Sequence, residues 1–242
     1  DLKTVMSTSA GWAPDVVRGD RTIDFATRPI ELLDLIPTVP TSQTAVNYME
    51  ETTFTNAAAE TDEAGAKPEA TLALTERSSS VRKIAVLLPV TDEQLEDVPR
   101  IQAYLNNRLP FMVRQRLAGQ IIAGDGTPPN LRGLLNTSGI QTQAKGADPT
   151  PDAVYKAMTL VRTTGQAEPD AVIFNPLDWQ DVRLLRTLDG IYIWGNPSDA
   201  GPDRIWGLPV IQAQAMTQNT AAVGAFGMYS ELDVKKGLVV ET

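Results

Sequence analysis

Polar and apolar residues alternate along two stretches of the chain between residues 46 and 90. A period of two places successive side chains on opposite faces and predicts strands. The two stretches flank a small, acidic segment at residues 56–69, so we predict one long antiparallel hairpin. Its apolar positions are Val46, Tyr48, Met49, Phe54, Leu72, Leu74, Ile84, Val86 and Leu88.

The predicted hairpin has too few apolar residues to be stable alone. Two arms of about 15 residues, at roughly 3.3 Å per residue, would reach about 50 Å. An isolated two-stranded ribbon is at best marginally stable in water. We therefore expect the hairpin to lie on another surface, and we expect that surface to belong to a second copy of the chain.

Apolar residues then recur every three or four positions between residues 95 and 121, which predicts a helix. Thr91 followed by Gln94 matches a capping box, and Gly124 marks the exit. About 30 residues at 1.5 Å each would make a helix of about 45 Å. Pro99 and Pro110 interrupt it. Because proline removes a backbone hydrogen bond, we expect a bend or a broken start at these positions.

From residue 150 the pattern changes to the short helices and strands of a compact α/β unit. We predict helices over residues 150–165 and 177–188, and strands over residues 171–174, 208–211, 221–226 and 237–240. Residues 1–30 mix glycine and proline with scattered apolar residues, as in an extended arm. A short apolar segment, residues 30–36, follows the arm.

The 242 residues include neither cysteine nor histidine. This composition excludes disulfides, thiol nucleophiles and catalytic triads that use histidine. The net charge of −9 argues against a tightly held nucleic acid, because phosphate contacts need clustered Lys and Arg. The chain has no apolar run long enough to cross a bilayer. We therefore expect a protein that is not an enzyme, with no cofactor, no metal site and no membrane contact.

Charge is distributed unevenly along the predicted hairpin. Residues 50–76 carry seven acids and only one base, and three bases follow at residues 77–83. A solvated loop explains any single charge, whereas the whole pattern favours an acidic tip that docks on a basic patch of a neighbouring subunit. The candidate inter-subunit contact residues are Glu60, Asp62, Glu63, Lys67, Glu69, Arg77, Arg82 and Lys83.

Two motifs invite a chemical interpretation that the residues do not support. The glycine-rich segment 124–133 follows a helix instead of joining a strand to one, and it lacks the Gly-Lys-Ser/Thr ending of a phosphate loop, so a structural turn is favoured. The acids Asp170, Asp178, Asp181 and Asp189 suit caps and exposed helix positions better than a catalytic pair. Trp179, Trp194 and Trp206 suit a core or a subunit contact.

Taken in order, several segments resemble the major capsid proteins of tailed bacteriophages, the Hong Kong 97-like family. The resemblance covers about residues 10–240. It rests on the order and spacing of residues 33–37 (LDLIP), 47–52 (NYMEET), 55–60 (TNAAAE), 65–69 (GAKPE), 81–85 (VRKIA), 102–109 (QAYLNNRL), 124–127 (GDGT), 175–179 (NPLDW), 190–192 (GIY) and 206–210 (WGLPV).

The resemblance implies an α+β fold with the architecture of the Hong Kong 97-like capsid proteins. It implies an N-terminal arm (1–30), an extended β-hairpin called the E-loop with its base (46–90), a P-domain built on a long spine helix (31–45 and 91–149) and an α/β A-domain (150–236). Residues 237–242 would start the return to the P-domain. Family members return through further strands, so we expect residues beyond Thr242.

The resemblance also implies a function. Copies would join as pentamers and hexamers into an icosahedral shell that encloses phage DNA without binding it tightly. Such a virion protein would assemble in the host bacterial cytoplasm, with portal, scaffold or decoration proteins as further partners. Lys67 occupies the E-loop position that in some relatives donates an isopeptide cross-link to an asparagine of a neighbouring subunit, and that asparagine would lie beyond Thr242.

Three other functions remain open from the sequence. An encapsulin-type nanocompartment shell shares the fold but packages enzymes. A carboxylate- or lysine-dependent enzyme on the α/β unit would need no histidine. A tail or decoration protein is the third alternative. The hairpin that cannot support itself favours a shell protein over the enzyme.

Overall fold

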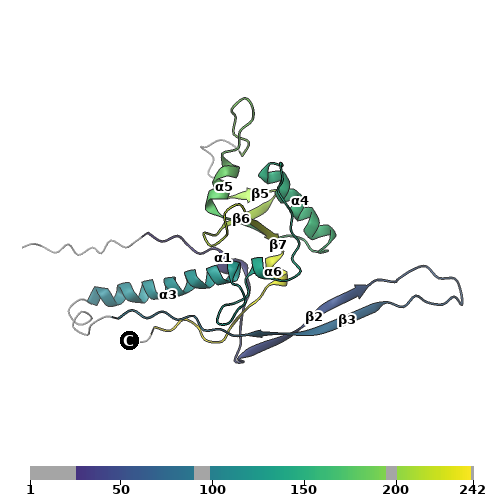
Figure 1. Ribbon diagram of the computed structural model, residues 1–242, viewed down its shortest axis with the longest axis horizontal. Coiled ribbons are helices and arrows are strands. Elements are labelled where there is room, and N and C mark those ends of the chain that lie inside the picture. Colours follow the sequence, from purple (N-terminus) through teal and green to yellow (C-terminus); the bar gives the residue numbers. More distant parts are fainter. Residues whose placement is uncertain (1–25, 90–98, 195–200, 241–242) are drawn as a thin grey trace, which may run out of the picture.

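The computed structural model describes residues 26–89, 99–194 and 201–240. Two long elements extend in opposite directions from a common centre, and a compact α/β unit lies above them (Figure 1). One long element is helix α3 (Pro99–Ala123), and the other is the hairpin of strands β2 (Ala45–Thr55) and β3 (Thr71–Ser80). The predicted mixture of a long helix, a long hairpin and an α/β unit is therefore present.

The hairpin pairs β2 antiparallel with β3, from Ala45 opposite Ser80 to Thr55 opposite Thr71. The register shifts once, between Glu51 and Thr53. Residues 81–89 form no strand, so the prediction that alternation continues as a paired strand to Leu88 is wrong. The reason is the position of the first strand. Strand β2 begins at Ala45, and a backbone hydrogen bond from Val81 N to Thr44 O lies just before it. Residues after Val81 therefore extend past the start of β2 and have no residue of that strand to pair with.

Helix α3 ends where Gly124 follows Ala123, as predicted. Its last two turns enter the protein core through Ala118, Ile121 and Ile122, all at most 9% exposed. Pro110 lies inside α3. Pro99 is the first residue of the helix, and the predicted capping box at residues 91–94 lies outside the described residues. A bend at either proline therefore stays a prediction.

The α/β unit contains a four-stranded sheet in the order β5-β6-β4-β7. The strands are β5 (Arg204–Ile205), β6 (Leu208–Gln212), β4 (Ala171–Phe174) and β7 (Ala221–Gly224). Strand β4 runs parallel to β6 and antiparallel to β7. All four residues of β4 are buried, which is typical of a strand covered on both faces.

The two faces of β4 contribute to two different cores. Val172 and Phe174 pack with helices α4 (Thr150–Thr163) and α5 (Pro176–Arg183). Ala171 and Ile173 pack on the other side, with helix α1 (Leu32–Leu35) and the end of α3. A single central strand therefore joins the α/β unit to the long helix.

The C-terminal part differs from the sequence prediction in three places. Helix α5 ends at Arg183 and not at Leu188, because residues 184–193 form a loop closed by the bridge between Arg186 and Tyr192. Strand β7 stops at Gly224, where Asp170 Oδ1 and Oδ2 accept hydrogen bonds from the backbone N–H groups of Phe226 and Gly227 and start helix α6 (Phe226–Tyr229).

The third difference concerns the last predicted strand. Residues 237–240 form no strand in the described chain. The strand lies earlier, at β8 (Leu232–Val234), which pairs in parallel with β1 (Thr38–Pro40). Alternation alone could not locate it, because a strand of three residues needs a partner to define it and this partner is almost 200 residues away in the sequence.

Candidate assembly surfaces

The hairpin exposes large apolar side chains on both of its strands. Tyr48, Met49, Phe54, Leu72 and Leu74 are between 54% and 66% exposed. Figure 1 shows the hairpin extending away from the body of the chain. Contiguous exposed apolar surface of this kind marks an interaction site in a stable protein. The expectation that the body of the chain does not cover the hairpin is thus confirmed for the described residues.

Polar contacts across the two strands hold the hairpin in register. Arg77 Nε donates to Glu50 Oε2 over 2.6 Å, and this hydrogen bond, aided by the carboxylate charge, raises the pKa of Arg77. Asn47 Nδ2 donates to Glu76 Oε1 over 2.9 Å. Both contacts are exposed, so they specify pairing more than they stabilise the fold. Arg77 is thus an intramolecular partner of Glu50.

The acidic residues gather in the loop that connects β2 to β3. Asn56 Oδ1 accepts from Ala58 N, and Asp62 O accepts from Gly65 N, so the loop has local structure of its own. The candidate contact residues in this loop are all exposed: Glu60, Asp62, Glu63, Lys67 and Glu69. Arg82 and Lys83 are exposed as well, but they lie beyond the opposite end of the hairpin. The structure therefore keeps Arg82 and Lys83 apart from the acidic candidates of the loop within one chain.

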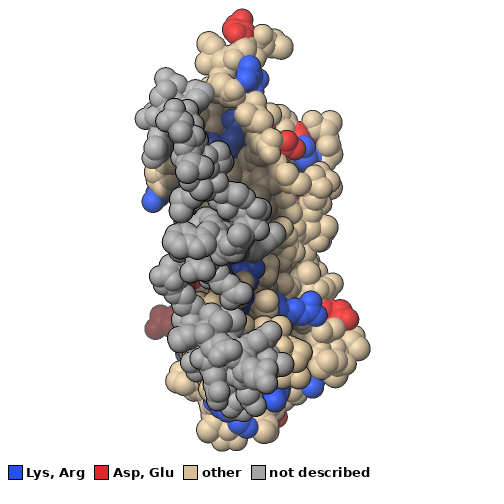
Figure 2. Space-filling view, turned by 90° about the vertical axis from the view of Figure 1, so that its left-hand side faces the viewer, with Lys and Arg blue, Asp and Glu red and all other residues tan. Residues whose placement is uncertain are grey.

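Basic residues collect on α3. Between Pro99 and Ala123 the sequence has four arginines and no acid, although the whole chain carries a net charge of −9. The described members are Arg108, Arg114 and Arg116. Figure 2 views the end of the molecule opposite the hairpin tip and shows Lys and Arg over much of this face, with some Asp and Glu among them. The arginines of α3 thus lie on a different element from the acidic loop of the hairpin.

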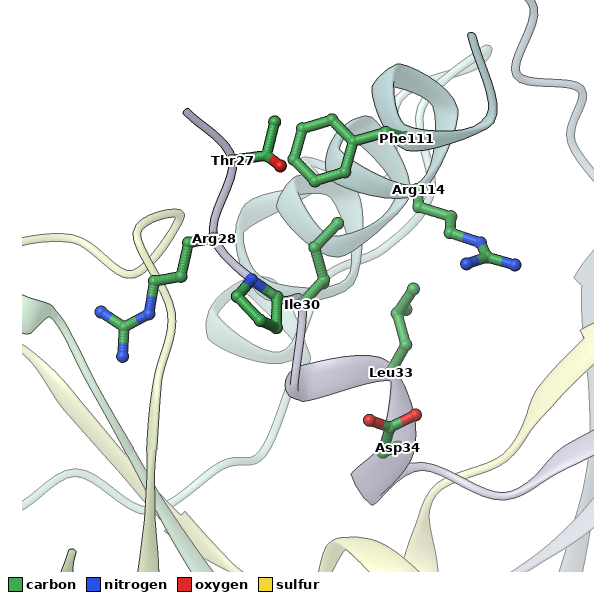
Figure 3. A pocket seen from close by; sticks show the side chains of 8 residues that line it. Thr27, Arg28, Ile30, Leu33, Asp34, Phe111 and Arg114 are labelled. Carbon is green, nitrogen blue, oxygen red and sulfur yellow. The ribbon is translucent and has the colours of Figure 1, made fainter. Parts of the chain in front are cut away.

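A depression of about 590 Å³ lies between residues 27–34 and α3 (Figure 3). Ile30, Leu33 and Phe111 face one another at its floor, while Arg28 and Arg114 point outward on opposite sides. Among the described residues that line it, Asp34 is the one acid. An apolar floor with one carboxylate offers no pair of groups for acid–base catalysis.

The turn after α3 is stabilised by hydrogen bonds between its own residues. Asp125 Oδ1 accepts from Thr127 N over 2.9 Å and from Asn130 Nδ2 over 3.0 Å, and these hydrogen bonds lower the pKa of Asp125. The buried Gln120 side chain accepts from Leu131 N. The glycine-rich segment is therefore a structural turn, as predicted, with these amide groups directed inward.

Asp178 and two of the tryptophans also have structural contacts. Asp178 accepts from Asn219 N over 2.8 Å. Trp179 is buried in the core, and Trp206 Nε1 donates to Pro151 O over 2.9 Å. Within the described residues, no three potential metal ligands come together. Nor does this part of the chain contain a helix that is long and apolar enough to cross a membrane.

One exposed apolar surface was not predicted from the sequence. The loop at residues 184–193 exposes Leu184, Leu188, Ile191 and Ile193, each by at least half. Arg186 stacks over the ring of Tyr192 at 4.2 Å and stiffens the loop. The alternation of Ile191 and Ile193 was the available signal. It was overlooked because the preceding apolar residues also fit a helix.

A long helix, a compact α/β unit and a projecting hairpin with exposed apolar side chains favour the class of proteins that associate through large surfaces. Comparison with known proteins defines the class further. The chain belongs to the phage capsid family, whose sequence model matches residues 17–242. It is 32% identical over 220 residues to the major capsid protein of Enterobacteria phage HK97.

The match to the HK97 protein covers 88% of this chain and 56% of the relative, so the chain spans little more than half of that protein's length. Solved structures agree on the fold. The capsid of an empty GTA particle matches with a TM-score of 0.77 at 19% identity, covering 100% of this chain and 88% of the other. The capsid of a native GTA particle matches with a TM-score of 0.71 at 23% identity, covering 94% and 84%.

A structure from Microbacterium phage Oxtober96 matches with a TM-score of 0.68 at 18% identity, covering 90% of this chain and 77% of the other. These findings confirm the predicted family and the Hong Kong 97-like α+β fold. They do not favour the encapsulin alternative, because the named relatives belong to phages and GTA particles.

Proposed function

We propose that this chain forms the shell of a bacteriophage head as a major capsid protein. Copies associate into pentamers and hexamers, which close into an icosahedral shell around DNA. The observation that carries the proposal is the hairpin: its exposed apolar residues need a covering surface, and the chain belongs to a family whose members build capsids. The chain contributes binding surfaces and no catalysis.

The hairpin makes the contacts between copies head-to-tail, because the surface that projects and the surface that receives it differ. Such heterologous contacts close into rings when the rotation allows it. Many modest contacts repeated around a closed shell stabilise it without any single strong interface. The charged residues Glu60, Asp62, Glu63, Lys67, Glu69, Arg82 and Lys83 at the hairpin tip and base steer this association. Arg77, the eighth candidate, is paired with Glu50 within the hairpin.

Other partners follow from the same role. Portal, scaffold and decoration proteins would contact the shell at special positions, and DNA would be enclosed without tight binding, in keeping with the net charge of −9. Assembly would take place in the cytoplasm of the host bacterium, and the product would be the virion capsid. The segmentation into arm, E-loop, P-domain and A-domain belongs to this proposal.

Electron microscopy of the expressed protein, beside its sedimentation profile, tests the proposal. We expect closed particles, or rings with five-fold and six-fold symmetry. A protein that stays a compact monomer at every concentration and salt tested would contradict the proposal and would return the enzyme alternative to first place.

Lys67 is the proposed cross-link donor. Its Nζ would attack the side-chain amide of an asparagine from a neighbouring subunit, forming an isopeptide bond and releasing ammonia. Lys67 is exposed on the hairpin loop, where a neighbour could reach it. Covalent ladders in a denaturing gel that disappear in Lys67→Arg would support the role. Assembled particles that dissociate wholly into monomers would exclude it.

A further inference from the structure

The register of the hairpin decides which side chains share a face. Directly paired residues of two antiparallel strands point to the same face, and so do residues two positions apart along a strand. Met49 pairs with Glu76, Glu51 with Leu74, and Phe54 with Leu72. One face of the hairpin, here called the apolar face, therefore carries Met49, Glu51, Phe54, Leu72, Leu74 and Glu76.

Phe54 lies on the apolar face because β2 contains one extra residue. Glu51 pairs with Leu74 and Thr53 pairs with Ala73, so Thr52 is left over, as in a β-bulge. In an uninterrupted ladder Phe54, three positions after Glu51, would point to the opposite face. Thr52 Oγ1 lies 3.1 Å from Thr75 Oγ1 and 3.4 Å from Ala73 O, contacts that hold the extra residue against β3.

The opposite face, here called the polar face, has a different character. It carries Tyr48 opposite Arg77, Glu50 opposite Thr75, and Thr53 opposite Ala73. The ion pair between Glu50 and Arg77 balances its two charges. The apolar face instead carries two acids and four large apolar side chains that are 59–66% exposed. The two faces of one ribbon thus differ both in polarity and in charge.

We propose that the apolar face is the face by which the hairpin docks on a second copy of this chain, with the polar face left in solvent. This inference rests on the proposed function and specifies its contact. Charge complementarity identifies the occupant. Glu51 and Glu76 accompany the apolar side chains, and α3 offers arginines without acids together with the exposed Met112. The bulge at Thr52 positions Phe54 for this contact.

Two neighbouring residues of β2 provide a matched test. Phe54 and Thr53 are both exposed but lie on opposite faces. In the full-length protein, Phe54→Glu should reduce the yield of assembled particles, measured by sedimentation, at least tenfold. Thr53→Glu adds the same charge to the polar face and should assemble like the unaltered protein, as should Phe54→Leu.

A second readout separates docking from folding. The dissociated subunits of Phe54→Glu and Thr53→Glu should melt at the same temperature as the unaltered subunit. If Phe54→Glu is unstable, Leu72→Glu on the opposite strand replaces it in the same assay. The inference is overturned if the apolar-face variants assemble normally, or if Thr53→Glu is as damaging. Failure of the unaltered protein to assemble would instead contradict the proposed function itself.

Discussion

At the scale of single residues, the turn after α3 depends on two glycines that lack room for a side chain. A Cβ at Gly133 would lie 2.5 Å from Gly124 N and 2.6 Å from Ile122 O. Both are backbone atoms, which cannot move aside as a flexible side chain could. These glycines therefore allow the returning chain to pass close to the end of the helix.

Gly133→Ala should destabilise the subunit by about 1–3 kcal/mol, because the added methyl group overpacks the turn. Gly119→Ala is the control, since nothing lies within 4 Å of its Cβ and it is inside α3. Removing glycine from a helix interior should stabilise by roughly 0.5–1 kcal/mol. Urea unfolding of the dissociated subunits measures both changes, and equal midpoints for the two variants would contradict the account.

Asp125 makes the stability of this turn depend on pH. Its folded-state pKa is lowered, first by the hydrogen bond from Thr127 N, so its charged form favours the folded state. This stabilisation is present above the unfolded pKa of about 3.9 and is lost as the pH falls through the lower folded value. Asp125→Asn keeps the acceptor oxygen but lacks the charge.

The difference in unfolding free energy between Asp125→Asn and the unaltered subunit should therefore be largest near pH 7 and should shrink toward pH 3. Urea unfolding at a series of pH values measures this difference. A difference that stays constant over the whole range would show that the carboxylate charge has no part in the turn.

At the scale of elements, the start of α5 connects two parts of the α/β unit. Asn175 Oδ1 accepts from Leu177 N, which caps the helix, and Asn175 Nδ2 donates to Met216 O over 2.7 Å. Met216 is buried in the core that includes α1 and α3. One side chain thus starts a helix on one face of the sheet and holds a loop on the other.

Asn175→Ala should destabilise the subunit by about 0.5–2 kcal/mol, the usual cost of losing an N-cap. Asn175→Asp keeps the cap acceptor but cannot donate to Met216 O, so it should show a smaller loss. Thermal unfolding of both variants separates the two contributions. A loss in Asn175→Asp as large as that in Asn175→Ala would mean that the contact to Met216 dominates.

The sequence allowed the buried elements to be predicted better than the exposed ones. Strand β4 was predicted with its observed bounds because four consecutive apolar residues leave few alternatives. The end of α5 was wrong because Leu184 and Leu188 fit a helical spacing although both are exposed. The bulge at Thr52 was not predicted, since a register is set by pairing between strands and not by either strand alone.

At the scale of the whole molecule, the last two turns of α3 are the part of its described residues that enters the core. Its last two turns are buried, whereas residues 104–117 are at most half-buried in the described chain. Pro110 lies within this less covered part and cannot donate a backbone hydrogen bond. We therefore expect α3 to change curvature at Pro110 when the shell matures and expands.

Pro110→Ala restores the missing hydrogen bond and should stiffen α3. Particles of this variant should assemble but should expand more slowly or incompletely, which cryo-electron microscopy of the particle diameter over time would measure. Pro99→Ala, at the first residue of the helix, tests the second predicted bend in the same way. Normal expansion of both variants would remove the prolines from the mechanism.

The pairing of β1 with β8 determines how a mechanical load on the hairpin is borne. Strand β1 lies just before the hairpin, and its pairing is extended by bonds from Leu232 N to Pro37 O and from Thr41 N to Val234 O. Strand β8 follows α6, whose Phe226 is anchored in the core. A pull on the hairpin acts on the C-terminal end of β1, whereas β8 is held at its N-terminal end by α6. Because β1 and β8 are parallel, these two ends lie at opposite ends of the pair. The two strands are then loaded in shear, so the hydrogen bonds between them bear the force together. They do not break one after another, as they would if the strands were unzipped from one end.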